Sequence, residues 1–290
     1  VDNGVLFSAD GSRLVAYPAR LHEGSGSAGK YRHYSVPSGV RRIEPQAFSD
    51  AVLLESIDLP GGLLEIGDEA FGNCQFLMRI EIPGSVRKLG INLFEGCTHL
   101  TSVTVRTENS CFKVVDRALL TADGKTLLEY LSYEKDSTEY TLPPQVEHIT
   151  DKAFYLRLQN RVRRVILPTG LRSIGREAFT GAHLAALRLP ESLQRVDDKA
   201  FSHVKLDLLE LTADIPQTGA DIFGRAEIGR CVIGKGVTNF NAALFKGIPR
   251  PRIELERGNR QYRLEDGALL GNGGRTLGVF SKDPAESQGV

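Results

Sequence analysis

Apolar and polar residues along the chain follow one pattern that returns about every two dozen positions. The stretches Ile57–Leu77 and Ile80–Leu100 match apolar position for apolar position, and weaker copies lie on both sides of them. A proline anchors most copies, and in two degenerate copies Thr212 and Gly234 take its place. Eleven positions after the anchor the chain always has phenylalanine: Phe48, Phe71, Phe94, Phe154, Phe179, Phe201, Phe223 and Phe245. Eight coincidences at one offset, in a chain with 13 Phe, indicate a repeat array.

The residues around each anchor predict a small strand-and-turn unit. Apolar residues alternate just before the anchor, as in Ile57 and Leu59, which predicts a short strand with one buried face. The proline ends the strand because it has no N–H to donate to a ladder. Glycines such as Gly67 and Gly175 divide the run to the phenylalanine into a turn, a brief extended segment and one helical turn. Such a unit closes no core alone, so we expect stacked units with each phenylalanine buried against the next.

A different motif interrupts the repeats three times. Residues 115–130 echo residues 2–17 and, less closely, residues 266–280. Apolar runs flank Asp10-Gly11 in the first copy and Asp123-Gly124 in the second. This arrangement predicts β-hairpins with primed turns.

Together the two motifs predict a single α/β repeat solenoid over residues 1–290. Its expected parts are a hairpin cassette at 1–30, three repeats at 31–106, a cassette at 107–137, five repeats at 138–256, and a cassette with a tail at 257–290. The first cassette lacks a preceding strand and the last lacks a following one. Because solenoids end in atypical caps, we expect more array or another domain beyond one or both termini.

The repeat Ile-x-Ile-Pro-x-x-Val-x-x-Ile-Gly-x-x-Ala-Phe-x-x-Cys-x-x-Leu resembles that of the BspA-type leucine-rich repeat proteins, and the likeness covers nearly the whole chain. It weakens between Thr212 and Phe223 and at Gly234, which replaces the proline. The resemblance implies a curved, right-handed leucine-rich-repeat-type solenoid with a parallel sheet on its concave face, short helical turns outside and inserted hairpins. It also implies a secreted or cell-surface bacterial protein that acts in adhesion by binding host or cell-surface macromolecules.

Composition narrows the range of partners. Lys plus Arg and Asp plus Glu are 36 each, so no net field attracts nucleic acid or an anionic membrane. No apolar run approaches the roughly 18 residues that span a bilayer. We therefore expect no nucleic-acid partner and no membrane insertion, and we take the protein to be a monomer.

Residues that carry chemistry do not gather into a motif. The six His show no paired metal-binding spacing, and no phosphate-binding glycine motif occurs. Cys74 and Cys97 occupy one place in successive repeats where other copies have Ala or Val, which favours small, buried, reduced thiols over a disulfide or metal site. The pairs Asp68-Glu69 and Asp197-Asp198 stand where helical turns should start, which favours a helix-dipole role over calcium binding. We therefore expect no catalytic, cofactor-binding or metal-binding residues.

One segment concentrates positive charge. Six cations fall within twenty residues: Arg157, Arg161, Arg163, Arg164, Arg172 and Arg176. The solvated edges of two adjacent repeats explain them more simply than a site for a polyanion, although both interpretations stay open.

The residues between the buried strand positions should form the exposed face of the sheet. In the first half they are small or charged: His33, Ser35, Ser56, Asp58, Arg79, Glu81, Ser102 and Thr104. In the second half the same columns hold Arg164, Ile166, Ala186, Arg188, Leu208, Glu210, Arg230, Val232, Arg252 and Glu254. Exposed aliphatic residues among arginines are typical of interface hot spots. We therefore predict that Arg164, Ile166, Arg188, Leu208, Glu210, Arg230, Val232 and Arg252 form a protein-binding surface.

Four classes of function are to be weighed. A non-enzymatic recognition or adhesion module fits the apolar and arginine-rich columns. An architectural spacer that displays another domain needs no such surface, and a glycan-binding surface protein would need aromatic platforms, which are scarce because the chain has no Trp. An enzyme would need unlike groups converging in a pocket, whereas an array places equivalent positions side by side.

Overall fold

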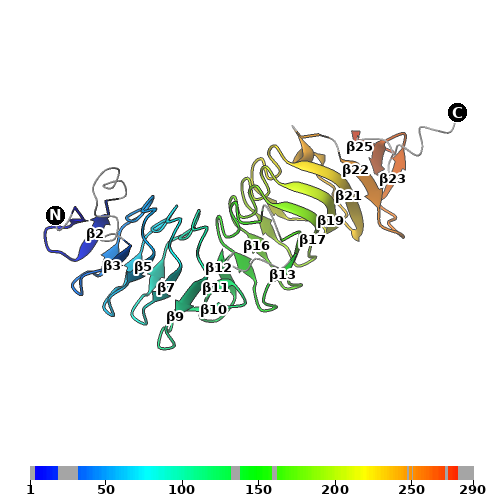
Figure 1. Cartoon of the computed structure of the whole chain (residues 1–290). Coiled ribbons are helices and arrows are strands. Elements are labelled where there is room, and N and C mark those ends of the chain that lie inside the picture. The colour runs from blue at the N-terminus through cyan, green and yellow to red at the C-terminus, as the bar shows by residue number, and fades with distance from the viewer. Residues whose placement is uncertain are drawn as a thin grey trace. The chain divides into compact units, whose positions relative to one another are not determined.

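The computed structural model describes residues 4–18, 32–131, 138–158, 162–246, 248–249, 251–271 and 274–279. Contacts divide the chain into two compact units, Val1–Lys135 and Asp136–Val290, each of which is a stack of parallel-strand coils (Figure 1). The expected single solenoid over residues 1–290 stays a prediction.

Unit 1 contains two sheets that run along its coils, and their strands are parallel except for the antiparallel pair β1 and β2. The strands that precede the anchors form one sheet: β3 (His33–Ser35), β5 (Ser56–Asp58), β7 (Arg79–Ile82) and β9 (Ser102–Val105). The brief segments after the anchors join the first hairpin in the other: β1 (Leu6–Phe7), β2 (Arg13–Ala16), β4 (Arg42–Ile43), β6 (Glu65–Ile66) and β8 (Lys88–Leu89). The second cassette contributes an antiparallel set: β10 (Phe112–Val115), β11 (Ala118–Thr121) and β12 (Thr126–Tyr130).

Unit 2 repeats this plan with longer strands. Its anchor-side sheet contains β13 (Glu139–Thr141), β15 (Arg164–Ile166), β17 (His183–Leu189), β19 (Lys205–Ala213), β21 (Glu227–Gly236) and β22 (Arg252–Leu255). Its second layer contains β14 (His148–Ile149), β16 (Ser173–Ile174), β18 (Arg195–Val196) and β20 (Gln217–Thr218). A three-stranded antiparallel set ends the described chain: β23 (Tyr262–Glu265), β24 (Ala268–Gly271) and β25 (Thr276–Val279).

The prediction of helical turns, and with it the α/β class, is wrong. Among the described residues, helix is confined to the 3-10 turn η2 (Ala242–Phe245). Around five of the phenylalanines, Phe48, Phe71, Phe154, Phe179 and Phe201, alternate N–H groups donate to carbonyls of the next coil, as Phe48 N–H does to Ala70 O at 2.8 Å. N–H groups between them close tight turns, as Ser49 N–H does by donating to Gln46 O. An N–H group that donates to the next coil cannot also make the i→i−4 hydrogen bond of an α-helix. We call the segments that extend two residues to either side of each phenylalanine the turn layer.

The turn layer has a backbone signature that the sequence pattern does not reveal. Positive φ recurs two residues before and two residues after the phenylalanine, for example at Gln46 (+57°), Asp50 (+61°), Glu69 (+53°) and Asn73 (+57°). A non-glycine residue in this region costs about 1–2 kcal/mol. The hydrogen bonds between coils must therefore offset a strain that recurs in the coils from Phe48 to Phe223.

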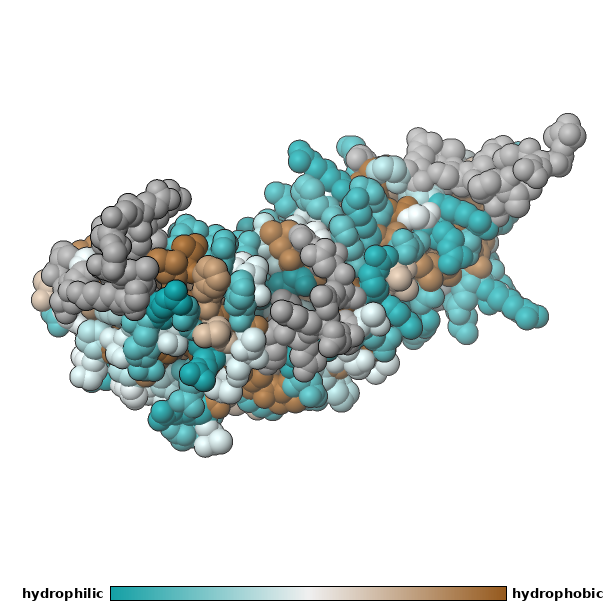
Figure 2. Space-filling model, in the orientation of Figure 1, coloured by the Kyte–Doolittle hydropathy of each residue, from teal (hydrophilic) through white to brown (hydrophobic). Residues whose placement is uncertain are grey.

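The phenylalanine column is the centre of the core, as predicted. In unit 1 the rings of Phe48, Phe71 and Phe94 stack with centroids 5.4 and 5.8 Å apart. In unit 2 the spacings from Phe154 to Phe245 are 4.7, 5.2, 5.4 and 5.8 Å. With these rings buried, the apolar surface in Figure 2 is limited to separate brown patches among teal and white residues.

The hairpins lie where the sequence places them, but the turns at Asp10-Gly11 and Asp123-Gly124 are not primed. In these two turns positive φ falls on Gly11 (+70°) and Gly124 (+77°) alone, whereas a type I′ turn also needs it at the preceding residue, as the turns at Asp116-Arg117 and Asp266-Gly267 have it. The preceding aspartates instead brace the turn: the Asp10 carboxylate accepts hydrogen bonds from the Ser8 and Ser12 hydroxyls, which lowers its pKa to about 2.

The second cassette joins the coils through a buried carboxylate. Glu129, which is 1% exposed, accepts the N–H groups of Leu93 and Phe94 at 2.9 and 3.0 Å. In the preceding coils the same kind of amide donates to a carbonyl of the next coil. Glu129 therefore supplies the acceptors where the regular repeat is interrupted.

The four cysteines of the chain are free thiols. Cys74 and Cys97 donate to the carbonyls of Phe48 and Phe71, both at 3.1 Å, but Cys97 is only half-buried, which corrects the expectation that both are fully buried. The Cys97 thiol and burial raise the pKa of Cys74, and burial raises the pKa of Cys231 to about 12.

Removing one ring of the stack should destabilise unit 2. Phe179→Ala should lower the free energy of unfolding by about 3–5 kcal/mol, because it removes buried surface and leaves a cavity between Phe154 and Phe201. Arg172→Ala, which removes an exposed ion pair with Glu147, should cost no more than about 1 kcal/mol. Equal effects of the two substitutions in urea melts would contradict the stacking model.

Close approach of the coils should make certain glycines irreplaceable. A Cβ on Gly90 would lie 2.3 Å from Asp68 N, a backbone atom that cannot move aside, whereas one on Gly39 would meet nothing within 4 Å. Gly90→Ala should therefore cost about 2–4 kcal/mol in urea denaturation, and Gly39→Ala should change stability by less than about 0.5 kcal/mol. A harmless Gly90→Ala would mean that the coils are further apart than described.

The raised thiol pKa values of Cys74 and Cys231 should suppress their reactivity. Little thiolate exists at neutral pH in either side chain, so iodoacetamide should label both only after unfolding. The check is peptide mass spectrometry of the labelled protein with and without urea. Labelling of Cys74 in the native protein at the rate of the unfolded chain would show that its coil opens.

Candidate functional site

The sheet of unit 2 arranges the predicted binding residues in two columns. Parallel pairing aligns Ala186 with Arg164 and with Leu208, and it aligns Arg188 with Glu210. The same register continues into β21 and β22, where the columns hold Arg230 with Arg252, and Val232 with Glu254. Alternate residues between them, such as Val165, Leu187 and Leu209, are buried. The alternation expected from the sequence is thus confirmed for this face.

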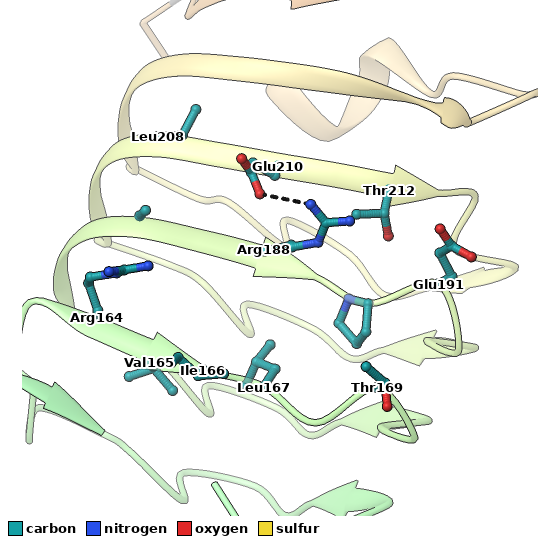
Figure 3. Close-up of a pocket in the computed structure, with 12 residues that line it drawn as sticks. Arg164, Val165, Ile166, Leu167, Thr169, Arg188, Glu191, Leu208, Glu210 and Thr212 are labelled. Carbon is teal, nitrogen blue, oxygen red and sulfur yellow. Dashed lines mark hydrogen bonds and ion pairs between the residues drawn. The ribbon is translucent and has the colours of Figure 1, made fainter. Parts of the chain in front are cut away.

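Part of this face is a depression of about 720 Å³. Five of the eight predicted residues line it: Arg164, Ile166, Arg188, Leu208 and Glu210. The other three, Arg230, Val232 and Arg252, lie further along the same columns and are not among its lining residues. Residues that the prediction did not name complete the lining, including Ala186, Thr169, Glu191 and Thr212. The last three come just after the strands or at their ends (Figure 3).

The floor of the depression is apolar. Ile166 is 40% exposed, which is high for an aliphatic side chain, and Ala186 and Leu208 are half-buried. Complete burial of a fully exposed aliphatic side chain contributes about 1.5–3 kcal/mol, and these partly buried side chains would contribute a fraction of that under a partner. The floor can therefore contribute binding energy, whereas the flanking polar residues orient what binds.

The arginines of the face are paired with carboxylates of the same sheet, which the sequence analysis missed. Arg188 Nη1 lies 3.4 Å from Glu210 Oε2 (Figure 3), and Arg164 Nη1 lies 3.3 Å from Glu139 Oε2. Glu254 accepts from both Arg230 and Arg252, at 3.3 Å each. The strand register places Glu139 beside Arg164 and Glu210 beside Arg188, whereas Glu254 stands opposite Val232 and reaches Arg230 diagonally. The face is consequently zwitterionic rather than cationic.

These ion pairs leave the side chains available to a partner. The Arg188 side chain is 67% exposed and that of Arg164 is 61% exposed. Exposed pairs contribute about 0–1 kcal/mol, so a binding partner can replace them at little cost. Their main effect is to favour partners whose charged groups are arranged in a complementary way.

The six-arginine segment does not form one site among the described residues. Arg163 pairs with Asp207 at 3.6 Å and Arg172 pairs with Glu147 at 3.2 Å, in different layers of the coil. The Arg176 N–H donates to Asp151 at 2.8 Å. Arg161 lies outside the described residues. The described part therefore favours solvated edges.

The sheet of unit 1 presents polar side chains, as predicted. The His33 ring lies 2.9 Å from the Ser56 hydroxyl and 3.2 Å from the Asp58 carboxylate. The order serine, histidine, aspartate matches that of a nucleophile with its base. The His33 and Asp58 side chains are 53% and 70% exposed, however, so water competes for each of these contacts. This arrangement is a surface hydrogen-bond network.

In the described ranges no three His, Cys, Asp or Glu side chains are placed to hold a metal ion together. Within the same ranges no helix has the length and apolarity needed to cross a bilayer.

The repeat matches a known family. A model of the BspA type leucine rich repeat region matches six copies, over residues 27–118 and 125–250. Among curated proteins no significant match was found.

Solved structures give the same fold. The pneumococcal vaccine antigen PcpA is similar with a TM-score of 0.66 and 25% identity, over 81% of this chain and 61% of that protein. A leucine rich cell surface protein from Faecalibacterium prausnitzii A2-165 is similar with a TM-score of 0.52 and 19% identity, over 78% of this chain and 61% of that protein. The chain thus spans less than two thirds of either protein.

Proposed function

Because the chain belongs to the BspA-type leucine-rich repeat family, we propose that it is a non-enzymatic recognition module of a bacterial cell-surface protein. Its ligand is a host or cell-surface protein. The binding surface is the exposed face of the unit 2 sheet, formed by Arg164, Ile166, Arg188, Leu208, Glu210, Arg230, Val232 and Arg252. Both solved relatives support the location, since one is a vaccine antigen and the other a cell surface protein.

The observation that carries the proposal is the apolar floor of the unit 2 depression. Ile166, Ala186 and Leu208 stand on three consecutive strands in neighbouring columns, with ion-paired side chains around them. Interfaces combine such an apolar centre with a polar rim, and arginine is enriched among their hot spots. The equivalent face of unit 1 has serine, threonine and charged residues instead, which a display scaffold would carry throughout.

The mechanism follows from the depth of the depression and from its charges. An aliphatic or aromatic side chain of the partner would rest on Ile166 and Leu208 and remove both from water. Arg188 and Glu210 would exchange their mutual contact for one with the partner, which selects partners whose charges are arranged in the complementary order. Binding through a flat sheet of fixed strands requires little ordering of this chain.

A paired substitution should abolish binding without unfolding the protein. Leu208→Asp with Arg188→Glu places two negative charges on the floor and rim, beside Glu210. We expect affinity for a protein ligand, selected from a panel of purified extracellular-matrix and serum proteins, to fall by at least about 100-fold. The measurement is surface plasmon resonance, with circular dichroism to verify the fold.

The control places the same charge change on the other unit. Arg79→Glu with Thr104→Asp alters two exposed positions of the unit 1 sheet and should leave affinity within about twofold of the native value. Retained affinity in the Leu208 and Arg188 variant would remove the unit 2 face as the binding site. A panel in which the isolated chain binds no protein would favour the spacer, and binding only to a glycan array would favour a glycan-binding protein.

A further inference from the structure

One row of side chains on the unit 2 face crosses four neighbouring strands. Register pairs Arg188 of β17 with Glu210 of β19, and Glu210 with Val232 of β21. Ile166 of β15 stands before Arg188, because each lies two residues beyond the paired Arg164 and Ala186. We call Ile166, Arg188, Glu210 and Val232 the mixed row. Its order is aliphatic, cation, anion, aliphatic.

The centre of the mixed row is charged and its surroundings are apolar. Arg188 and Glu210 contact each other at 3.4 Å, and their side chains are 67% and 32% exposed. Ala186 and Leu208 stand beside them in the neighbouring column and are half-buried. Ile166, at 40% exposed, and the half-buried Val232 lie at the two ends. A partner that fits this row must therefore match two charges inside an apolar frame.

The spacing of the row is set by the coils. Neighbouring strands of a sheet lie about 4.7–4.9 Å apart. On the core side of the same four coils, the rings of Phe179, Phe201, Phe223 and Phe245 follow one another at 5.2, 5.4 and 5.8 Å. A partner that contacts every member of the row must present one side chain about every 5 Å along a line.

An α-helix meets this requirement and an extended segment does not. Residues three or four apart share one face of a helix, with a pitch of about 5.4 Å, so three steps accumulate an error of about 2 Å against the strands. Alternate residues of an extended segment are about 6.6–6.8 Å apart. Three such steps accumulate about 6 Å, which is more than one strand spacing. An extended segment that begins on Ile166 would therefore pass beyond Val232.

The shape of the face also favours a convex occupant. Ile166, Arg188, Leu208 and Glu210 all line the depression of about 720 Å³, and its apolar floor lies between the strands' flanking residues (Figure 3). A helix is a cylinder about 10 Å across and can rest in such a hollow. The sheet face of a second copy has the same hollow, so two such faces would leave the floors apart.

We propose that the partner of the unit 2 face presents an amphipathic helix that lies along the mixed row. The helix carries an aliphatic residue, an acid, a base and an aliphatic residue at positions i, i+4, i+7 and i+11. Its acid contacts Arg188, its base contacts Glu210, and its aliphatic residues pack on Ile166 and Val232. The reverse order of acid and base fits a helix that runs the other way. This inference rests on the proposed function and specifies what the protein ligand presents.

The test uses fluorescein-labelled, alanine-based helical peptides of about 18 residues. All carry leucine at i and i+11, and they differ at i+4 and i+7, which hold Glu/Lys, Glu/Glu or Lys/Lys. We expect fluorescence anisotropy to give a dissociation constant below about 1 mM for the Glu/Lys peptide with the native protein. The other two should bind at least about fivefold more weakly, because each places one like charge opposite the row. A Glu/Lys peptide with a central proline, which breaks the helix, should lose at least about tenfold.

Substitutions in the row should invert this preference. Glu210→Arg leaves two cations in the row and should make the Glu/Glu peptide the tightest ligand, whereas Arg188→Glu should favour the Lys/Lys peptide. A variant that merely unfolds would lose all three peptides and could not exchange their order. Glu81→Arg, which changes an exposed acid on the unit 1 sheet, should leave the native order unchanged.

Four results would overturn the proposal. Equal binding of the proline peptide would indicate an extended ligand, and a dimer of the native protein that Leu208→Asp dissociates would indicate a second copy on this face. Equal affinity for the three charge forms, or no binding up to about 1 mM, would exclude the helix. If no peptide binds while a protein ligand is still lost in the Leu208 and Arg188 variant, the proposed function stands without a helical partner.

Discussion

The main-chain hydrogen bonds between successive coils are the constraint on which the remaining structure depends. They run through both strand layers and through the turn layer, so each coil is held to the next at the distance of an N–H···O=C bond. That distance places the phenylalanine rings 4.7–5.8 Å apart, which is the range in which aromatic rings stack. It also leaves no room for a Cβ at Gly67, Gly90, Gly175 or Gly219, each of which faces the backbone of the coil before. The ring stack and the glycines thus follow from one spacing.

The sequence predicted what depends on side-chain burial and missed what depends on backbone pairing. Phenylalanine at a fixed offset identified the stack, and alternation around Ile166 and Leu208 identified the exposed columns. The helical turn was wrong because Ala47-Phe48 and its equivalents suit a helix locally, while the inter-coil bonds that exclude one come from residues more than twenty positions away. The length of β17 was also missed: this strand begins at His183, four residues after Phe179, whereas β7 begins at Arg79, eight residues after Phe71.

The candidate site likewise has some features that the sequence predicts and others that depend on which strands pair. Its columns follow from a period of two, which any single strand reveals. Its electrostatic character depends on which strands are neighbours, so the contacts of Arg188 with Glu210 and of Arg230 with Glu254 appear only once the register is known. A count of arginines along the chain therefore overstated the positive charge of the face. The apolar floor does not depend on the pairing of charges, because it follows from side-chain burial alone.

A repeat array also loses its regular hydrogen bonds between coils where it is interrupted. Inside the array every coil satisfies the donors of the coil before it, so the backbone presents nothing to bind. Where a hairpin or a 3-10 turn follows a regular coil, the donors remain but their acceptors do not, and something else must supply them. Glu129 does so from within the chain at Leu93 and Phe94. The coil of Phe223 is followed by the 3-10 turn η2, whose Leu244 and Lys246 N–H groups donate to Asn241 and Ala243 within the turn itself. Departures from the repeat, which weaken its resemblance to a consensus, are thus the places where a solenoid needs contacts that its regular coils do not.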